Sequence, residues 1–209
     1  SNNWPGVRRD GKGGGHWKDD LPECNVKEYI EKTKELMSLD EWDMSPEKTK
    51  ILFLTNNLIA SEQKFKNLTD CFQYTDDYLK KNDKYVQFFL EVIEPTVFAY
   101  EKQQYGELLQ IKKKNHPQLK CQADKTEWLN ILDRVMHARS NSNVGDMLDI
   151  LMETKILRIS SKIEESERRY KQLISKSTDE LDEDEAKFVK KLSKLRSVDY
   201  LEVANLGEY

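Results

Sequence analysis

The sequence predicts an all-α protein: an elongated helical bundle of about six helices, with coiled-coil-like heptad seams and an irregular N-terminal arm. Charged residues make up 34% of the 209 residues, whereas the chain has only 8 glycines and 5 prolines. Many charges and few turn residues are typical of long helices. Alternation of apolar and polar residues with a period of two, which marks strands, never continues long enough to support a sheet.

Residues 1–23 are predicted to form a flexible arm. This segment contains five of the eight glycines and two of the four tryptophans, and it has no apolar periodicity of helix or strand type. The helical domain is expected to occupy residues 24–209. A possible subdivision of that domain separates residues 24–120 from residues 121–209.

Two helix starts are predicted early in the domain. Asn25 with Glu28 forms a capping box, in which the side chain of each residue accepts a hydrogen bond from the backbone amide of the other. Ser45 followed by Pro46 predicts a second start, because serine caps free amides and proline tolerates the first helical position.

The clearest apolar pattern begins at Ile51. Apolar residues recur there at alternating spacings of three and four as far as Leu79, which predicts one continuous helix on the order of 43 Å long. A third helix is expected from Val86 to Ile111, and Pro95 is expected to kink or split it near Glu94. Lysines at 112–114 suit its C-terminal end, where the helix dipole is negative.

The last third of the chain is predicted to contain three further helices. Their starts are marked by Asp, Asn or Ser, followed three residues later by Glu in two of the three cases. These signals are Asp124 with Glu127, Asn143, and Ser177 with Glu180. The second of these helices is expected to continue at heptad spacing to Leu173.

The expected core is rich in aromatic side chains, and the cysteines are expected to be ordinary buried thiols. Three widely spaced cysteines, an odd number, make a disulfide framework improbable and favour a reducing compartment, so we expect an intracellular, cytoplasmic or nuclear protein. No apolar run is long enough for a membrane span. The residues concerned are Cys24, Cys71 and Cys121, with the aromatic stripe Phe65, Phe72, Tyr78, Phe88, Phe89, Phe98, Tyr100 and Tyr105.

The sequence contains no motif that would support catalysis, so we expect no enzyme activity, cofactor or metal. The nearest metal-like spacing is His116 to Cys121, a single pair where a zinc site requires two. The acidic run within residues 179–185 lacks the glycine and the final glutamate of a calcium loop, and carboxylates in the first turn of a helix explain it better.

Four residues of the arm are the candidate partner-binding residues. Trp4 and Trp17 provide large apolar side chains, and Arg8 and Arg9 provide positive charge. They could form a tryptophan-bearing motif for a protein pocket, stack on single-stranded nucleic acid, or pack on the chain's own helices. The surrounding NNWPG and GGHW resemble the tryptophan-glycine motifs of Argonaute-binding proteins, which implies a protein partner.

A second resemblance covers residues 129–165 and 182–195. The segments LNILDRVMHARSNSNVGDMLDILMETKILRISSKIEE and DEDEAKFVKKLSKL resemble the helical N-terminal domain of transcription elongation factors. Leu157 stands where that family usually has glycine. The resemblance implies a domain that docks disordered acidic-hydrophobic motifs.

The most favoured function is a non-catalytic protein–protein interaction, dimerisation or scaffold module of a larger intracellular protein. Long heptad helices rarely hide every apolar face within one monomer, so a protein partner or self-association through helices is expected. The alternative is a nucleic-acid-associated helical module that uses the arm. The net charge of −4 argues against a broad phosphate-binding face.

Overall fold

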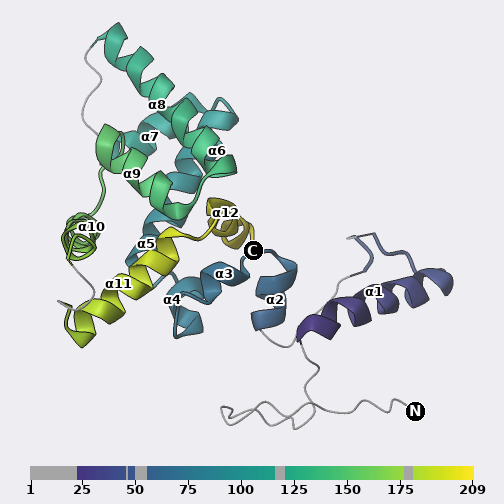
Figure 1. The fold of residues 1–209 in the computed structure, drawn as a ribbon. Coiled ribbons are helices and arrows are strands. Elements are labelled where there is room, and N and C mark those ends of the chain that lie inside the picture. Colours follow the sequence, from purple (N-terminus) through teal and green to yellow (C-terminus); the bar gives the residue numbers. More distant parts are fainter. Residues whose placement is uncertain (1–22, 46, 50–55, 116–120, 177–180) are drawn as a thin grey trace. The chain divides into compact units, whose positions relative to one another are not determined.

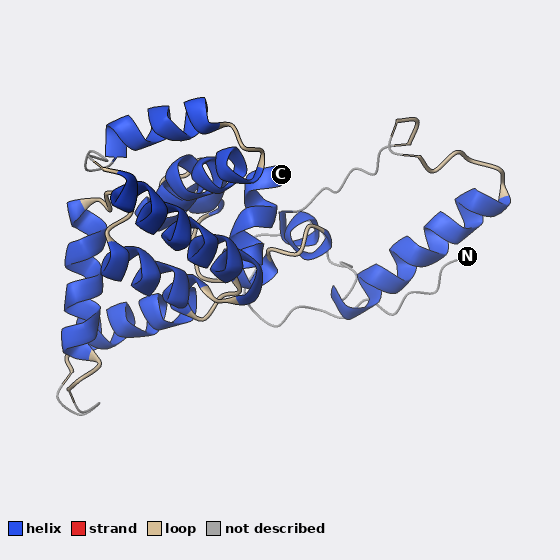
Figure 2. Ribbon diagram, turned by 90° about the horizontal axis from the view of Figure 1, so that it is seen from above, coloured by secondary structure: helices blue, strands red, loops and turns tan. Residues whose placement is uncertain are grey.

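The structure is a computed structural model that describes residues 23–45, 47–49, 56–115, 121–176 and 181–209. Every regular element in these ranges is a helix, and they contain no strand (Figures 1 and 2). The all-α prediction is therefore confirmed. The chain divides into two compact units, Ser1–Leu58 and Ile59–Tyr209. The domain boundaries expected at residues 23 and 120 stay predictions.

Helix α1 (Glu23–Leu39) is the long helix of the unit Ser1–Leu58. It begins before Asn25, so the helix start predicted there is wrong. Glu41 adopts a left-handed φ of 61°, and the amide of Trp42 donates to the carbonyl of Met37 at 3.0 Å, which closes the helix end. Residues 47–48 form a turn, and Pro46 lies outside the described residues.

The long helix predicted from Ile51 to Leu79 is wrong over its described part. The chain forms three short helices there: α2 (Asn56–Glu62), α3 (Lys66–Thr69) and α4 (Thr75–Leu79). Lys64 adopts a left-handed φ of 59°, and the amide of Phe65 donates to the carbonyl of Ala60 at 2.8 Å. Because a lysine takes this conformation, no glycine marks the helix end in the sequence.

The next helical run contains a π-helical turn before Pro95. Its parts are α5 (Lys84–Phe88), η1 (Phe89–Ile93) and α6 (Glu94–Glu101). Proline cannot donate the backbone hydrogen bond of a continuous α-helix, and the π-turn lies where that bond is lost. The predicted interruption near Pro95 is thus a change of helix type.

The third predicted helix ends ten residues early. Gln103 has a left-handed φ of 57° and separates α6 from α7 (Tyr105–Asn115). The expectation of one helix through Ile111 is therefore wrong. Helix α7 does end just after residues 112–114, where the lysines were expected to meet its C-terminus.

The C-terminal part of the chain contains five helices where three were predicted. Asn143 caps its helix as expected, accepting from the amide of Asp146 at 2.8 Å. The helix after it stops at a left-handed Lys155, φ 49°, and a new one starts six residues later, so the continuous helix to Leu173 is wrong. The five are α8 (Gln122–Asn141), α9 (Val144–Thr154), α10 (Ser161–Leu173), α11 (Glu183–Arg196) and α12 (Tyr200–Glu208).

One of the predicted capping boxes is displaced. Helix α8 starts with a box formed by Cys121 and Asp124, so the box predicted at Asp124 and Glu127 is wrong. Helix α11 starts with a box formed by Asp182 and Glu185, and its first turn contains Glu183, Asp184 and Glu185, which are part of the acidic run that we assigned to a helix start. The box predicted at residues 177–180 lies outside the described residues. The six-helix bundle with continuous heptad seams is not confirmed.

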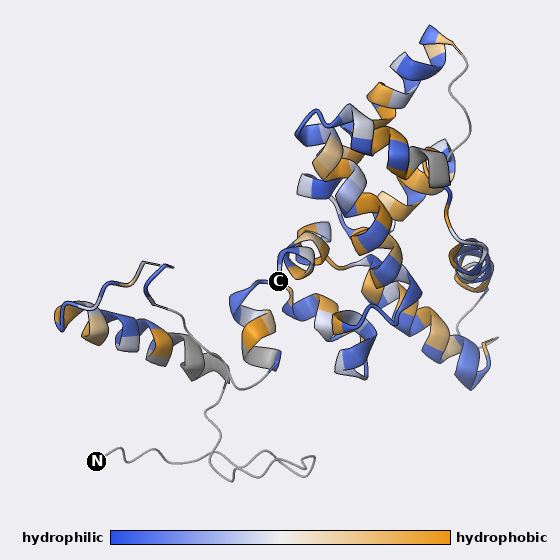
Figure 3. Cartoon of the chain, turned by 180° about the vertical axis from the view of Figure 1, so that it is seen from behind, coloured by the Kyte–Doolittle hydropathy of each residue, from blue (hydrophilic) through white to orange (hydrophobic). Residues whose placement is uncertain are grey.

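The unit Ile59–Tyr209 has a continuous apolar core. Helix α8 packs on α6, α9 and α12, while α11 packs on α9 and α10. Apolar residues, orange in Figure 3, lie among these packed helices, whereas α10 is largely hydrophilic. None of the helices described is long and apolar enough to cross a membrane.

The predicted aromatic core is largely present, with two exceptions. Four members of the stripe are buried, namely Phe65, Tyr78, Phe88 and Phe89, and Phe72 and Tyr100 are partly buried against the core. Phe98 and Tyr105 are instead 54% and 53% exposed. The buried-thiol prediction holds for Cys71, whose pKa burial raises to about 11, but it is wrong for the exposed Cys121.

Candidate docking pocket

Helix α12, which we did not predict, is fixed to the loop between α8 and α9. The amide of Val144 donates to the carbonyl of Val198 at 2.8 Å, and the amide of Tyr200 donates to the carbonyl of Ser142 at 3.0 Å. These two bonds pair the segments that precede α9 and α12. They hold the start of α12 against the core.

A buried carboxylate fixes α12 to α3 as well. Glu202 is 9% exposed and accepts hydrogen bonds from Asn67 Nδ2 at 2.6 Å and from the amide of Leu68 at 2.9 Å. The amide belongs to the first turn of α3, which has no cap of its own. Charged acceptors make strong hydrogen bonds, so α12 and α3 are held as one piece.

A pocket lies between α4, α6 and α12, with one side chain contributed by α8. Its cavity volume is about 860 Å³, which is within the range of ligand-binding clefts and exceeds the space that a single side chain fills. Its lining is mainly apolar. The lining residues used below are Leu79, Lys81, Leu90, Glu94, Phe98, Glu101, Arg139, Leu206, Gly207, Glu208 and Tyr209.

The rim of the pocket includes three large apolar side chains that are exposed to water. Leu79 is 38% exposed, Phe98 54% and Tyr209 59%. The ring of Tyr209 packs on the buried ring of Phe65 at a centroid distance of 5.8 Å, which fixes one side of the opening. The ammonium of Lys102 lies 5.9 Å from the centroid of the Phe98 ring.

An ion pair lies deeper in the pocket, joining α6 to α8. Arg139 Nε is 3.2 and 3.1 Å from the two carboxylate oxygens of Glu94, and Nη2 donates to Oε2 at 2.9 Å. The side chains are 24% and 16% exposed. Each charge of the pair neutralises the other. The other charged side chains of the lining, Lys81, Glu101 and Glu208, lie at exposed positions.

Tyr200 is buried next to this ion pair. Its side chain is wholly inaccessible, and its ring meets that of Phe89 edge-on at 5.4 Å. The hydroxyl lies close to Glu94 but outside the geometry of a normal hydrogen bond. Burial, with the negative charge of Glu94 nearby, raises the pKa of Tyr200 well above its ordinary value, so the phenol stays protonated.

Gly207 keeps part of the pocket open. A Cβ atom at this position would lie 3.1 Å from Leu90 Cδ2 and 4.0 Å from Glu94 Cγ. Glycine is unfavourable within a helix, by roughly 0.5–1 kcal/mol relative to alanine, and here it leaves space between α12 and the π-turn. A larger side chain would project into the pocket wall.

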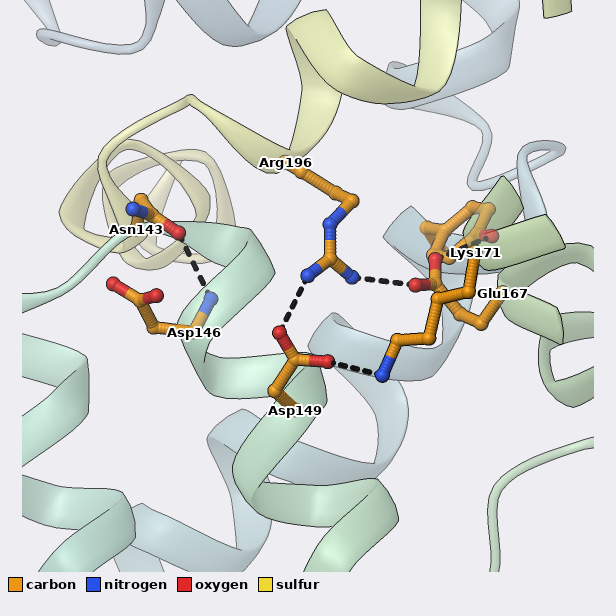
Figure 4. Close-up of polar contacts among 7 residues, drawn as sticks. Asn143, Asp146, Asp149, Glu167, Lys171 and Arg196 are labelled. Atoms are coloured by element: carbon orange, nitrogen blue, oxygen red, sulfur yellow. Dashed lines mark hydrogen bonds and ion pairs between the residues drawn. The ribbon is translucent and has the colours of Figure 1, made fainter. Parts of the chain in front are cut away.

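A second ionic cluster lies where α9, α10 and α11 meet (Figure 4). Arg196 donates to Asp149 Oδ2 at 2.6 Å and to Glu167, and Lys171 donates to Asp149 Oδ1 at 2.8 Å. The wholly buried Glu167 also accepts from the hydroxyl of Tyr85 at 3.0 Å. Each carboxylate therefore has two partners within the chain, which is the arrangement of a structural network.

The partner-binding residues predicted from sequence, Trp4, Arg8, Arg9 and Trp17, lie outside the described residues, as does His116. The part of the chain that is described contains no group of three or more His, Cys, Asp or Glu residues placed to hold a metal ion. Phe98 belongs to the pocket although its spacing predicted a core position. Asp199 with Glu202 offered a helix-start signal for α12 that we did not use.

Comparison of the sequence with protein-family models found no match, and comparisons with curated proteins and with solved structures found none either.

Proposed function

We propose that the chain is a non-catalytic protein-binding module and that the pocket between α4, α6 and α12 receives apolar side chains from a short segment of a partner. The observation that carries this proposal is the set of water-exposed apolar side chains, Leu79, Phe98 and Tyr209, around one cavity. Burial of such surface contributes about 25 cal/mol per Å², and apolar groups clustered around a pocket are typical of binding sites.

The chemistry of the lining supports binding over catalysis. Among the described residues that line the pocket, none is Ser, Cys or His. Its least exposed charged groups, Glu94 and Arg139, hold each other in a two-pronged ion pair, so each already has a partner within the chain. A recess whose lining is mainly apolar suits recognition of a peptide anchor.

A pair of matched variants tests the proposal. Random peptides displayed on phage are selected on the full chain, and the best peptide is measured against Phe98→Asp and Tyr105→Asp. Both aromatic side chains are about half exposed, but only Phe98 lines the pocket. We expect Phe98→Asp to weaken binding about tenfold or more, because it places a charge in the apolar rim, and Tyr105→Asp to leave it unchanged.

Gly207→Val provides a second variant that adds bulk without charge. It should also weaken the selected peptide, because the new side chain presses on Leu90 and fills the recess. The proposal is overturned if selection yields no peptide, or if peptides bind all variants as well as the original chain. Far-ultraviolet circular dichroism of each variant confirms that its helices are intact.

A further inference from the structure

The polar groups deep in the pocket have hydrogen-bonding capacity left over. Arg139 carries five N–H donors, of which Nε–H and one on Nη2 are used by Glu94. No described residue accepts from Nη1. The two oxygens of Glu94 together offer about four acceptor positions, and the hydrogen bonds from Arg139 do not fill all of them. The pair can therefore both donate to and accept from a ligand.

The charge balance of the pair limits what that ligand group can be. A carboxylate would face Glu94, and an ammonium would face Arg139, at a site where both side chains are less than a quarter exposed. A charged group that reaches this pair loses much of its water and meets a like charge beside the opposite one, whereas Lys81, Glu101 and Glu208 lie at exposed positions of the lining. A neutral group that is both donor and acceptor satisfies the pair without that cost.

The apolar surroundings require the same ligand to have a flat hydrophobic body. Leu90, Phe98 and Leu206 line the pocket around the ion pair, and the absent side chain of Gly207 leaves room beside Leu90. Aromatic rings pack on such surfaces and bury a large area with few rotatable bonds. Among the side chains, tyrosine joins a ring of this kind to a hydroxyl that can donate and accept.

We infer that the anchor of the partner segment is a tyrosine, with its ring on the apolar wall of the pocket and its hydroxyl on the Glu94–Arg139 pair. The inference rests on the proposed function. It names the class of partner: a peptide segment with an accessible, unmodified tyrosine. Phosphorylation of that tyrosine would bring about two negative charges against Glu94 and would abolish binding.

The test compares peptides that differ by one oxygen atom. The tightest peptide from the phage selection is synthesised with tyrosine, phenylalanine or phosphotyrosine at its anchor position, and binding to the full chain is measured by isothermal titration calorimetry. We expect about a tenfold loss for phenylalanine, because a hydrogen bond to charged groups is lost and their donors stay unpaired. The phosphorylated peptide should not bind measurably.

A double variant connects the discrimination to the pair. Glu94→Met combined with Arg139→Met keeps unbranched side chains and removes both charges together with their hydrogen-bonding groups. Affinity for the phenylalanine peptide should change little, while the preference for tyrosine should largely disappear. If the double variant is less helical than the original chain, the peptide comparison on the unaltered protein still decides.

The outcomes separate the two proposals. Peptides that depend on Phe98 but use an aliphatic anchor, or that bind equally with tyrosine and phenylalanine, overturn the tyrosine inference and leave the protein-binding function standing. The function and the inference are overturned together if the peptides bind the Phe98 and Gly207 variants as well as the original chain. The same holds if no peptide is selected at all.

Discussion

Arginine–carboxylate ion pairs occur in two places in the chain. Comparing them separates a pair that stabilises the fold from a pair that is available to a ligand. Around Arg196, every charged partner is supplied by the chain, and the side chain of Glu167 is wholly buried. Around Arg139, one carboxylate is supplied and the remaining donors face a pocket. A complete network holds helices together, whereas an incomplete pair in an apolar recess leaves bonds for a ligand.

The largest expected effect is on the free energy of unfolding, and it is measured by substituting each of the two arginines. Arg196→Met should lower the free energy of unfolding by about 3–5 kcal/mol, because it leaves the buried Glu167 with only Tyr85 as partner. Arg139→Met should cost less, about 1–2 kcal/mol, since the Glu94 side chain is partly exposed whereas Glu167 is wholly buried. Urea unfolding followed by circular dichroism measures both. Equal losses would remove the distinction that we draw between the two sites.

A smaller effect concerns acid stability of the Arg196 cluster. Burial alone would raise the pKa of Asp149, but hydrogen bonds from Lys171 and Arg196 outweigh it and hold the pKa below the ordinary 3.8. A carboxylate with a lowered folded pKa contributes stability above its unfolded pKa, and this contribution is lost as the pH falls through the folded value. The sign is therefore a loss in acid.

Asp149→Asn is the matched variant, because it keeps the shape and removes the charge. The difference in unfolding free energy between the original chain and this variant should be below about 1 kcal/mol at pH 7, since Asp149 is partly in water. It should shrink as the pH falls below about 4. A difference that grows in acid would show that the partners of Asp149 do not stabilise its ionised form.

The sequence predicted the helical class but not the lengths of the helices. Capping at Asn143 was read correctly because it depends on two residues close in the chain. The long helices were wrong because they end at Lys64, Gln103 and Lys155, which adopt left-handed backbone conformations without glycine. Apolar spacing continues across these positions, so local patterns do not reveal the breaks.

The pocket could not be predicted for a different reason. Leu79 and Phe98 belong to α4 and α6, and Tyr209 directly follows α12, so their shared exposure depends on how those helices pack. Gly207 looks like a helix end in the sequence, and only the approach of Leu90 shows that its missing side chain shapes a cavity. Helix α12 itself was within reach of sequence reasoning, since Asp199 does cap it.

The most direct test of the central claim is methyl nuclear magnetic resonance of the full chain, labelled on Ile, Leu and Val and titrated with the selected tyrosine peptide. If the pocket is the docking site, the methyl signals of Leu79, Leu90 and Leu206 shift most, while those of the exposed Leu109 and Ile174 stay in place. Shifts concentrated at Leu109 or Ile174, with the pocket signals unchanged, would contradict it.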